Sequence, residues 1–305
     1  MRVKFWGVRG SIPCPGPNTV QYGGNTPCIE LRFHNPERLI IVDAGSGIRE
    51  LGNAMMIHDF PKGPIQTEIF LTHTHWDHIM GFPFFTPIYI PGTHLKVYGP
   101  VSYEQDSLEK VVGGQLSYRY FPVRHIELAA RIEYFDLKEG DLELGDGISL
   151  TTKYLNHPVL CLGYRFEFEN KSICTVYDTE PFRNLFCMDT GSPSYNEEMS
   201  LEGEQVAKEQ NEAIEQFMFG ADLVIYDSQY TQGEYELGKI GWGHSPIEHV
   251  CMVADRAKVK RMALFHHEPM RTDEQMKELE RIHCREGNHD HAEIFFARER
   301  MEIDL

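Results

Sequence analysis

The apolar residues of this chain fall into short runs that are typical of β-strands. Most of these runs are rich in β-branched or aromatic residues. Many strands in succession indicate large sheets. The predicted strands are Arg2–Trp6, Cys28–Phe33, Leu39–Asp43, Glu68–Leu71, His94–Tyr98, Arg131–Phe135, Ile148–Tyr154, Gly163–Phe168, Ser172–Tyr177, Leu223–Tyr226, Met262–Phe265 and Glu293–Phe296.

Helix-start signals are clearest in the second half of the chain. Ser245, Pro246 and Glu248 combine an N-cap residue, a first-turn proline and a capping-box glutamate. Thr272 and Gln275 repeat the capping-box pattern. We therefore predict that one helix begins at each of these two places.

A third helix is predicted over Glu202–Phe219 from its apolar stripe of Val206, Ala213, Ile214 and Phe217. No Gly/Ser-rich linker or block of like charges divides the chain. We predict a single α/β domain over residues 1–305 in which helices cover the sheets. The polar stretch within residues 182–204 is the expected surface excursion.

Composition and charge narrow the classes of protein. The chain has 305 residues, 41% of them hydrophobic and 25% charged, which is typical of a globular fold. Its 46 acidic and 29 basic residues give a net charge of −17, which disfavours bulk binding to nucleic acid or anionic lipid. The chain contains no apolar run of membrane-spanning length, and its seven scattered cysteines do not form a C-x-x-C motif. We expect a cytoplasmic protein with reduced thiols.

One segment carries the strongest chemical signal, T-E-I-F-L-T-H-T-H-W-D-H. His73 and His75 follow a predicted strand, where alternate side chains face the same way and can present two imidazoles to one point. Asp77 and His78 lie where the chain turns toward a helix and can face a second point nearby. This spacing predicts half of a site for two metal ions.

Three further residues are candidate ligands because each follows the end of a predicted strand. His157 is a candidate third imidazole for the first metal, Asp178 a candidate bridging carboxylate, and His266 a candidate ligand of the second metal. His267 competes with His266, and the sequence does not settle which imidazole turns inward; we favour His266.

The H-T-H-W-D-H segment resembles the H-x-H-x-D-H signature of the metallo-β-lactamase-fold hydrolases. The V-D-A-G-S-G segment around Asp43 resembles the family's early aspartate-glycine motif, and His157, Asp178 and His266 fall where the family has its later ligands. The resemblance implies an αββα sandwich of two mixed β-sheets flanked by helices. It also implies that the Asp43 carboxylate supports the metal site from behind the ligands.

Within that family the chain is most similar to the phosphodiesterase branch that contains RNase Z and cyclic-nucleotide phosphodiesterases. The W-G-V-R-G-S-I-P segment resembles the branch's glycine-rich N-terminal turn, and Y-D-T around Asp178 its ligand aspartate motif. The G-H-S segment around His244 resembles a motif whose histidine contacts the scissile phosphate. Asp227 falls where RNase Z carries a glutamate that shuttles protons with that histidine.

Two divalent ions in such a site can share a hydroxide that attacks the phosphorus in line. The resemblance implies one ion on His73, His75 and His157, with a second ion on Asp77, His78 and His266 and Asp178 bridging the two. Asp77 could also orient the hydroxide. His244 would stabilise charge on phosphorus or protonate the leaving oxygen, with Asp227 tuning its basicity. Imidazole and carboxylate ligands favour Zn²⁺, with Mn²⁺, Fe, Co²⁺ or Ni²⁺ as alternatives.

The predicted function is therefore hydrolysis of a phosphodiester by a dinuclear metal enzyme, with a small or cyclic nucleotide as substrate. The alternatives are a tRNA 3′-processing endonuclease, a non-catalytic nucleotide-binding metalloprotein, and a lactonase or thioesterase. The lack of a Lys/Arg-rich insertion and the charge of −17 favour a small substrate over tRNA. The resemblance also implies a homodimer.

Two aromatic features are left with two interpretations. Trp76 lies inside the signature, and it could line the site or pack beneath the metal-binding loop. The run from Phe82 to Tyr89 is interpreted as core or dimer-interface packing in preference to a wall that stacks a base.

Overall fold

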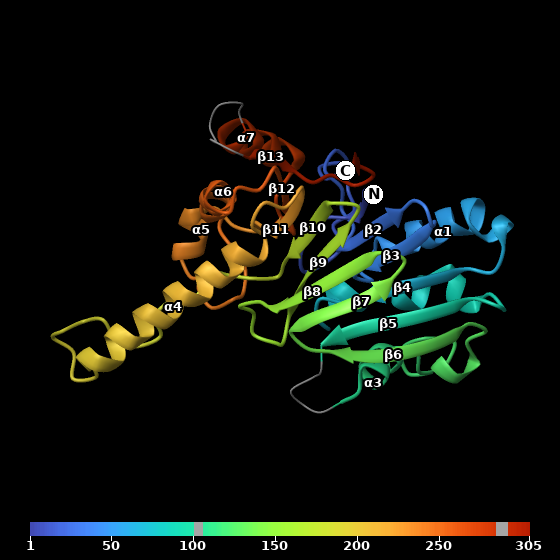
Figure 1. Cartoon of the computed structure of the whole chain (residues 1–305), viewed down its shortest axis with the longest axis horizontal. Helices are drawn as coiled ribbons and strands as arrows, with labels where there is room; N and C mark the ends of the chain where they lie inside the picture. Colours follow the sequence, from blue (N-terminus) through green and yellow to red (C-terminus); the bar gives the residue numbers. More distant parts are fainter. Residues whose placement is uncertain (101–105, 285–291) are drawn as a thin grey trace.

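The computed structural model describes residues 1–100, 106–284 and 292–305, and within them two seven-stranded mixed sheets face each other (Figure 1). The first sheet has the order β14-β1-β2-β3-β4-β5-β6, and the second has the order β13-β12-β11-β10-β9-β8-β7. The strands of the first sheet are β1 Arg2–Gly7, β2 Cys28–Phe33, β3 Arg38–Val42, β4 Gln66–Phe70, β5 His94–Pro100, β6 Arg131–Leu137 and β14 Glu302–Asp304. The strands of the second are β7 Gly140–Gly145, β8 Ile148–Tyr154, β9 Leu162–Phe168, β10 Lys171–Val176, β11 Leu223–Asp227, β12 Arg261–Phe265 and β13 Glu293–Phe296.

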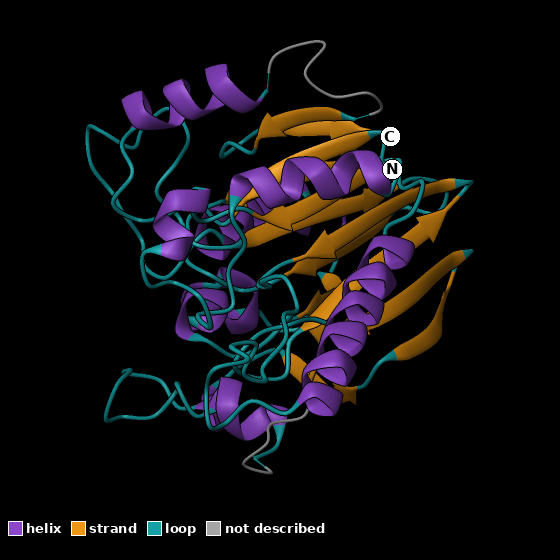
Figure 2. Cartoon of the chain, turned by 90° about the vertical axis from the view of Figure 1, so that its left-hand side faces the viewer, coloured by secondary structure: helices purple, strands orange, loops and turns teal. Residues whose placement is uncertain are grey.

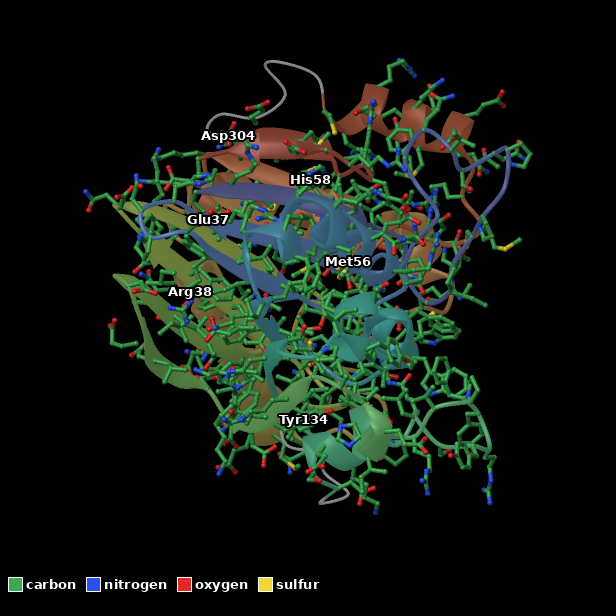
Figure 3. All side chains as sticks on the ribbon, turned by 90° about the vertical axis from the view of Figure 1, so that its right-hand side faces the viewer. Glu37, Arg38, Met56, His58, Tyr134 and Asp304 are labelled. Atoms are coloured by element: carbon green, nitrogen blue, oxygen red, sulfur yellow. The ribbon has the colours of Figure 1, made fainter. Side chains whose placement is uncertain are left out.

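Helices lie outside both sheets, as Figures 1 and 2 show. On the first sheet, α1 contributes Ile48, Leu51 and Met55 to a buried cluster with Ile41 and Ile69. Met56 and His58, near the end of α1, are labelled in Figure 3. The helices are α1 Ile48–His58, α2 Trp76–Ile79, α3 Leu108–Gly113, α4 Glu197–Phe217, α5 Gln232–Glu236, α6 Ile247–Arg256 and α7 Asp273–His283; short 3₁₀ turns span Phe60–Lys62, Phe82–Phe84, Thr86–Tyr89 and His125–Glu127.

A central apolar layer holds the two sheets together. Phe5 and Phe70 of the first sheet pack in one cluster with Phe166 and Phe265 of the second, and all four side chains are fully buried. Burial of each such ring contributes roughly 1.5–3 kcal/mol. The two mixed sheets with flanking helices confirm the αββα architecture predicted from the sequence. None of the helices in the described ranges has both the length and the apolar character to cross a lipid bilayer.

All twelve predicted strands are present, and two more were missed. β7 is an edge strand whose side chains are almost all exposed, and β14 is only three residues long. β7 has no buried apolar pattern, and β14 is too short to show one, although its Ile303 is buried. Each pairs through its backbone with one neighbouring strand. All seven cysteines are free.

The helix that begins near Ser245 was predicted wrongly at its first turn. α6 begins at Ile247, Pro246 is its N-cap, and no side chain caps it. The Ser245 hydroxyl instead donates to the carbonyl of Thr179 at 2.7 Å, and Glu248 accepts from the backbone N–H of Gln232 at 2.8 Å. His244 therefore precedes the helix rather than lying at its N-terminus. The second capping box, Thr272 with Gln275, is present at the start of α7.

The predicted helix over Glu202–Phe219 is longer than expected, and only part of its predicted stripe, Ile214 and Phe217, is buried. α4 begins at Glu197, and Asn196 caps it by accepting from the N–H of Met199 at 3.0 Å. Val206 is exposed, and the buried stripe runs through Ser200, Gly203, Ala207, Ile214 and Phe217. The irregular loop before α4 and the first turns of α4 extend away from the body of the molecule (Figure 1).

The carboxyl ends of six strands bring the predicted site residues to one edge of the sandwich. Loops that follow β3, β4, β8, β10 and β12 carry one or more of these residues, and β11 ends on Asp227. Parallel pairing of β3 with β4 and of β10, β11 and β12 aligns these ends. The fold therefore concentrates polar side chains where the strands stop, which is a general place for sites in α/β sheets.

The opposite end of the first sheet carries a network of paired charges. The Arg38 guanidinium, labelled in Figure 3, contacts the Glu68 carboxylate at 2.6 Å, and Arg32 contacts Asp59 at 2.8 Å. These residues line a pocket of about 570 Å³. Because each arginine is already neutralised by a carboxylate, neither is available to an anionic ligand.

Candidate metal centre

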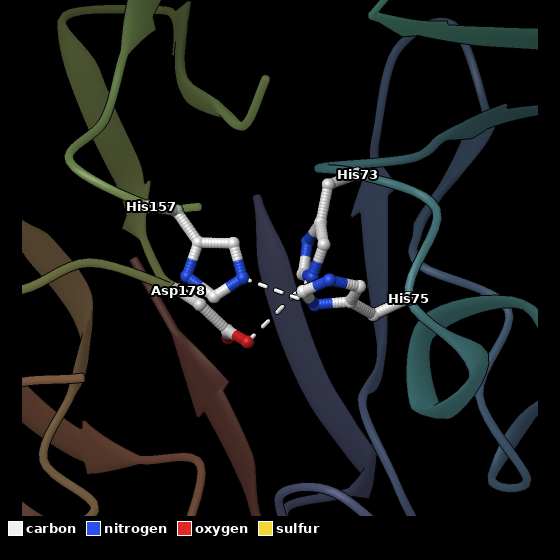
Figure 4. A group of neighbouring side chains, drawn as sticks. All are labelled: His73, His75, His157 and Asp178. Carbon is white, nitrogen blue, oxygen red and sulfur yellow. Dashed lines mark hydrogen bonds and ion pairs between the residues drawn. The ribbon is translucent and has the colours of Figure 1, made fainter. Parts of the chain in front are cut away.

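Three histidines and one aspartate form the first cluster of the site (Figure 4). His75 Nδ1 lies 3.0 Å from His157 Nε2, and the ring of His73 lies 4.7 Å from that of His157. The Asp178 Oδ2 atom lies 3.7 Å from His73 Nε2. Three loops that are distant in sequence, those after β4, β8 and β10, therefore meet here. Each presents at least one possible metal-binding atom to a common point.

A second cluster adjoins the first on the other side of Asp178. His266 Nε2 lies 3.2 Å from Asp77 Oδ2 and 3.3 Å from Asp178 Oδ1. His78 Nε2 lies 3.4 Å from Oδ2 of both Asp77 and Asp178. Asp178 therefore belongs to both clusters, with a donor atom of each residue within 4.8 Å of the others in its cluster.

Several buried nitrogen and oxygen atoms of these clusters have no hydrogen-bond partner within the described part of the chain. They include Nε2 of His73, Nε2 of His78 and Oδ1 of Asp178. A buried polar atom without a partner costs about 1–3 kcal/mol, so three at one point require a ligand. Imidazole nitrogens and carboxylate oxygens together are a donor set that suits divalent metal ions. The residues present therefore fit a metal pair.

Two residues behind the donors fix their orientation. Asp43 Oδ2 lies 2.9 Å from His78 Nδ1, and Asp43 Oδ1 accepts from the N–H of Thr72 at 2.8 Å. The Thr72 hydroxyl lies 3.1 Å from His73 Nδ1 and also reaches Asp43. Thr72 was not predicted from the sequence, although it lies beside the signature. Such contacts set the tautomer and the ring orientation of a metal-binding histidine.

The imidazoles of the first cluster are held neutral. Burial lowers the pKa of His73 and His75 below the ordinary histidine value and lowers that of His157 to about 4. A neutral imidazole keeps the lone pair that a metal ion needs. The pKa of Asp178 is lowered although burial acts to raise it, because His266 and His78 favour its charged form.

His244 and Asp227 form a buried pair next to the second cluster. His244 Nδ1 lies 2.7 Å from Asp227 Oδ2, and the ring of His244 stacks on that of His266 at 4.9 Å. Burial acts to lower the pKa of His244, but the charges of Asp227 and Asp178 outweigh it and raise that pKa to about 9. Asp227 is fixed in turn by the backbone N–H groups of Thr179 and Gln229.

The two adjacent histidines after β12 point in different directions. His266 faces the second cluster, whereas His267 Nε2 lies 2.8 Å from the carbonyl oxygen of Ala297 and its ring packs against Phe296. Gly10 allows His266 to fit, because a Cβ at that position would lie 2.5 Å from the imidazole. The sequence contained this glycine in the W-G-V-R-G-S turn but gave no signal for its role.

Gly243 makes room for His157 in the same way. Its carbonyl oxygen lies 3.0 Å from His157 Nδ1, its φ is 81°, and an added Cβ would lie 2.2 Å from that nitrogen. We expect Gly243→Ala to displace the imidazole and to lower the free energy of unfolding by about 2–4 kcal/mol, since strain from positive φ and overpacking act together. Denaturant unfolding measures this change.

Gly238→Ala is the matched control for that variant. Gly238 also has a positive φ, 125°, but a Cβ there would meet no atom within 4 Å. Gly238→Ala should therefore lower the free energy of unfolding only by the part due to backbone strain, about 1–2 kcal/mol. Equal losses in the two variants would show that close packing on His157 is not what requires a glycine at 243.

An open pocket of about 540 Å³ leads to the two clusters. Its lining includes His75, Asp77, Asp178 and His244, together with Ser11, Thr74 and Trp76. The backbone N–H of Ser11 donates to Asp77 Oδ2 at 2.7 Å, so the N-terminal turn holds one of the donor carboxylates. This volume is within the range that accommodates a small organic ligand.

Comparison with known proteins finds relatives in both sequence and structure. The family model for the metallo-beta-lactamase superfamily matches residues 22–173. Ribonuclease Z from Lactococcus lactis subsp. cremoris (strain MG1363) is 26% identical over 331 residues, covering 99% of each chain. Among solved structures, a diphosphatase from the PhnP family has a TM-score of 0.63 at 16% identity, covering 100% of this chain and 97% of that one. Human tRNase Z, short form, has a TM-score of 0.58 at 18% identity, covering 100% and 99%. At these identities the solved structures establish a shared fold.

Proposed function

Because this chain belongs to the metallo-beta-lactamase superfamily, we propose that it is a dinuclear metal-dependent hydrolase of phosphodiesters. The observation that carries the proposal is the position of Asp178, whose buried carboxylate is shared by two adjacent clusters of histidine and aspartate side chains. One carboxylate common to two imidazole-rich clusters is an arrangement suited to holding two cations side by side. The full-length similarity to a ribonuclease Z supports phosphodiesters as the substrate class.

Under this proposal His73, His75 and His157 would hold one ion, Asp77, His78 and His266 would hold the other, and Asp178 would contribute to both. The nitrogen-rich donor set without a cysteine favours Zn²⁺. When bound, the ions would supply a water of lowered pKa and positive charge for the phosphoryl oxygens. The Ser11 N–H fixes the Asp77 carboxylate, which would be placed to orient that water.

His244 holds a proton on the pocket side of the site. Its Nδ1 contacts Asp227, which leaves Nε2 free to donate to a phosphoryl oxygen or to the leaving oxygen. The raised pKa keeps the imidazole protonated near neutral pH, as a proton donor requires. Asp227 thus acts through His244 and does not itself contact the substrate.

We propose a small or cyclic nucleotide as the substrate. The segment that extends from the body of the molecule is acidic, and its glutamates between Asn196 and Gln205 are Glu197, Glu198, Glu202 and Glu204. Together with a net charge of −17, this segment opposes docking of a long polyanion. A small diester needs only the locally cationic site, so the overall charge affects it much less.

A second candidate, tRNA 3′ processing, rests on a specific observation. The similarity to a ribonuclease Z extends over 99% of both chains, which includes every site residue discussed above. The site chemistry is the same for both candidates. They differ in whether the surface outside the pocket binds RNA.

Turnover of a substrate panel tests the proposal. We expect metal-loaded protein to hydrolyse bis(p-nitrophenyl) phosphate and at least one cyclic mononucleotide or dinucleotide, and to leave a precursor tRNA uncut. Cleavage of the tRNA alone would favour the second candidate. Hydrolysis of only an acyl lactone or thioester, or binding of nucleotide without turnover, would contradict both.

The support of His78 by Asp43 gives a separate prediction. Asp43→Asn keeps the shape of the side chain but removes the charge that faces His78 Nδ1 at 2.9 Å. We expect metal affinity to fall about 10- to 100-fold, the usual effect of removing such a partner. Competition with a fluorescent chelator measures it, and an unchanged affinity would mean that the metals do not depend on the orientation of His78.

We further propose that the protein is a cytoplasmic homodimer. Free thiols at all seven cysteines suit a reducing compartment. On the extended segment, Leu185 and Leu201 are exposed, and a second copy of the chain could cover them. Sedimentation velocity of the purified protein distinguishes a dimer from a monomer.

A further inference from the structure

Trp76 is an exposed aromatic residue between donors of the two clusters. It follows His75 and precedes Asp77, yet 78% of its own surface is exposed. Its side chain lines the open pocket together with His75, Asp178 and His244. Of the two interpretations left open by the sequence, packing beneath the loop is therefore excluded.

Trp76 also differs from the other two tryptophans of the chain. Trp6 donates from Nε1 to Glu30 at 2.6 Å, and Lys4 Nζ lies 4.6 Å from its ring. Trp242 is covered by Lys239 Nζ at 3.8 Å. Across residues 1–100, 106–284 and 292–305, no such ring or cation contact involves Trp76. Leaving a large apolar ring open to water forgoes about 1.5–3 kcal/mol of burial, so a ligand that covers it would recover this energy.

The backbone that carries Trp76 is fixed with respect to the donor atoms. The N–H of Met80 donates to the Trp76 carbonyl at 2.7 Å, and the N–H of Ala44 donates to the His78 carbonyl at 2.7 Å. The neighbouring Asp77 side chain is held by the Ser11 N–H. A group that stacks on Trp76 would thus lie at a defined distance from a phosphate bound at the clusters.

The remaining aromatic candidates near the signature do not offer a free face at this pocket. Phe82 and Phe85 are fully buried in the core under the first sheet, so these two rings of the aromatic run are core packing. Phe84, which is partly exposed, packs edge-on against Phe121 at 5.4 Å. Among the residues that line the pocket, Trp76 is therefore the one whose aromatic ring has a face open to a ligand.

We propose that Trp76 stacks on the base of a nucleotide substrate and so selects nucleoside phosphates over phosphates that lack a base. The inference rests on the proposed function, because it takes the phosphate to be held at the two clusters. Stacking on an aromatic side chain tolerates every base, since each has a π face. Trp76 therefore sets the substrate class, and it does not take part in bond cleavage.

Equilibrium binding of two probes tests this role. Adenosine 5′-monophosphate and ribose 5-phosphate carry the same phosphate and sugar, and only the first has a base. By calorimetry on metal-loaded protein, we expect the nucleotide to bind about 5- to 150-fold more tightly, the range for one stacked base. Trp76→Ala should remove this preference and leave the Kd for ribose 5-phosphate within about twofold.

Two further variants separate stacking from a structural role. Trp76→Phe keeps a π face and should retain most of the preference, whereas Trp76→Leu keeps apolar bulk without a π face and should lose it. Phe60→Ala is the matched control, since Phe60 is an exposed aromatic before the start of β4, at the opposite end of the strand from the site. It should leave both Kd values unchanged.

The outcome is independent of the turnover test. No preference of the wild-type protein for the nucleotide would overturn the role of Trp76, even if phosphodiesters are hydrolysed. Preservation of the preference in Trp76→Ala, or equal loss in the Phe and Leu variants, would overturn it as well. Failure to hydrolyse any phosphodiester would instead overturn the proposed function.

Discussion

Asp178→Ala is expected to have the largest effect of any single substitution in this protein. Its carboxylate is fully buried and lies within 3.3–3.7 Å of nitrogens from His73, His78 and His266. Removing it takes a donor from both clusters at once. We expect the metal content to fall from two ions per chain to one or fewer, and phosphodiester turnover to fall by more than about 100-fold, since loss of an outer partner alone costs 10- to 100-fold.

Elemental analysis and initial rates on bis(p-nitrophenyl) phosphate measure these changes. Asp189→Ala is the control, because Asp189 also precedes a threonine but is exposed, and its carboxylate accepts from the N–H of Gly191 at 2.9 Å. It should retain full metal content and activity. Wild-type turnover in both Asp178→Ala and His75→Ala would exclude the two-metal arrangement.

His244→Ala is expected to have the second largest effect, with a different signature. His244 is adjacent to the second cluster, and its Nδ1 is committed to Asp227 at 2.7 Å. Loss of its proton should lower kcat by about 10²- to 10⁴-fold, the usual contribution of a general acid. The metal content should stay at two ions per chain, because both clusters keep their complete donor sets. Loss of metal in this variant would mean that His244 is a ligand.

Asp227→Asn provides the corresponding test of pH dependence. The Asp227 carboxylate is the largest influence that raises the pKa of His244 toward about 9, against the effect of burial. Its removal should lower that pKa, so a step that needs protonated His244 loses rate at a lower pH than in the wild-type protein. The alkaline limb of the kcat profile measures the shift, and a limb that does not move would show that His244 is not the proton donor.

The sequence predicts most of this fold because hydrophobic burial dictates most of it. The predicted strands coincide with β1–β6 and β8–β13, whose side chains largely alternate between buried and exposed or lie wholly in the core. The edge strand β7 lacks such a pattern, and β14 is too short for its single buried residue to indicate a strand, so only pairing with a neighbour reveals them. The first turn of α6 was wrong because the Ser245 hydroxyl serves the Thr179 carbonyl, a contact between distant segments.

His73, His75, His157, Asp178 and His266 were predicted because each follows the carboxyl end of a strand, and the fold brings those ends together. Asp43, Asp227 and His244 were predicted from the resemblance to a known family. Their functions as ligands and proton donors stay predictions. Contacts that depend on the relative position of separate loops were not found. Examples are Thr72 between Asp43 and His73, and the close approach of Gly10 and Gly243 to imidazoles. The exposure of Trp76 likewise follows only from the assembled pocket.

Titration of metal into chelator-treated protein tests the central claim most directly. Zn²⁺ is added in fractions of an equivalent while hydrolysis of bis(p-nitrophenyl) phosphate is followed. If the two clusters that share Asp178 each bind one ion, activity is absent at the start and reaches its plateau at two equivalents of Zn²⁺ per chain. Full activity at one equivalent or fewer, or no hydrolysis with Zn²⁺ or Mn²⁺ at any ratio, would contradict a dinuclear phosphodiesterase.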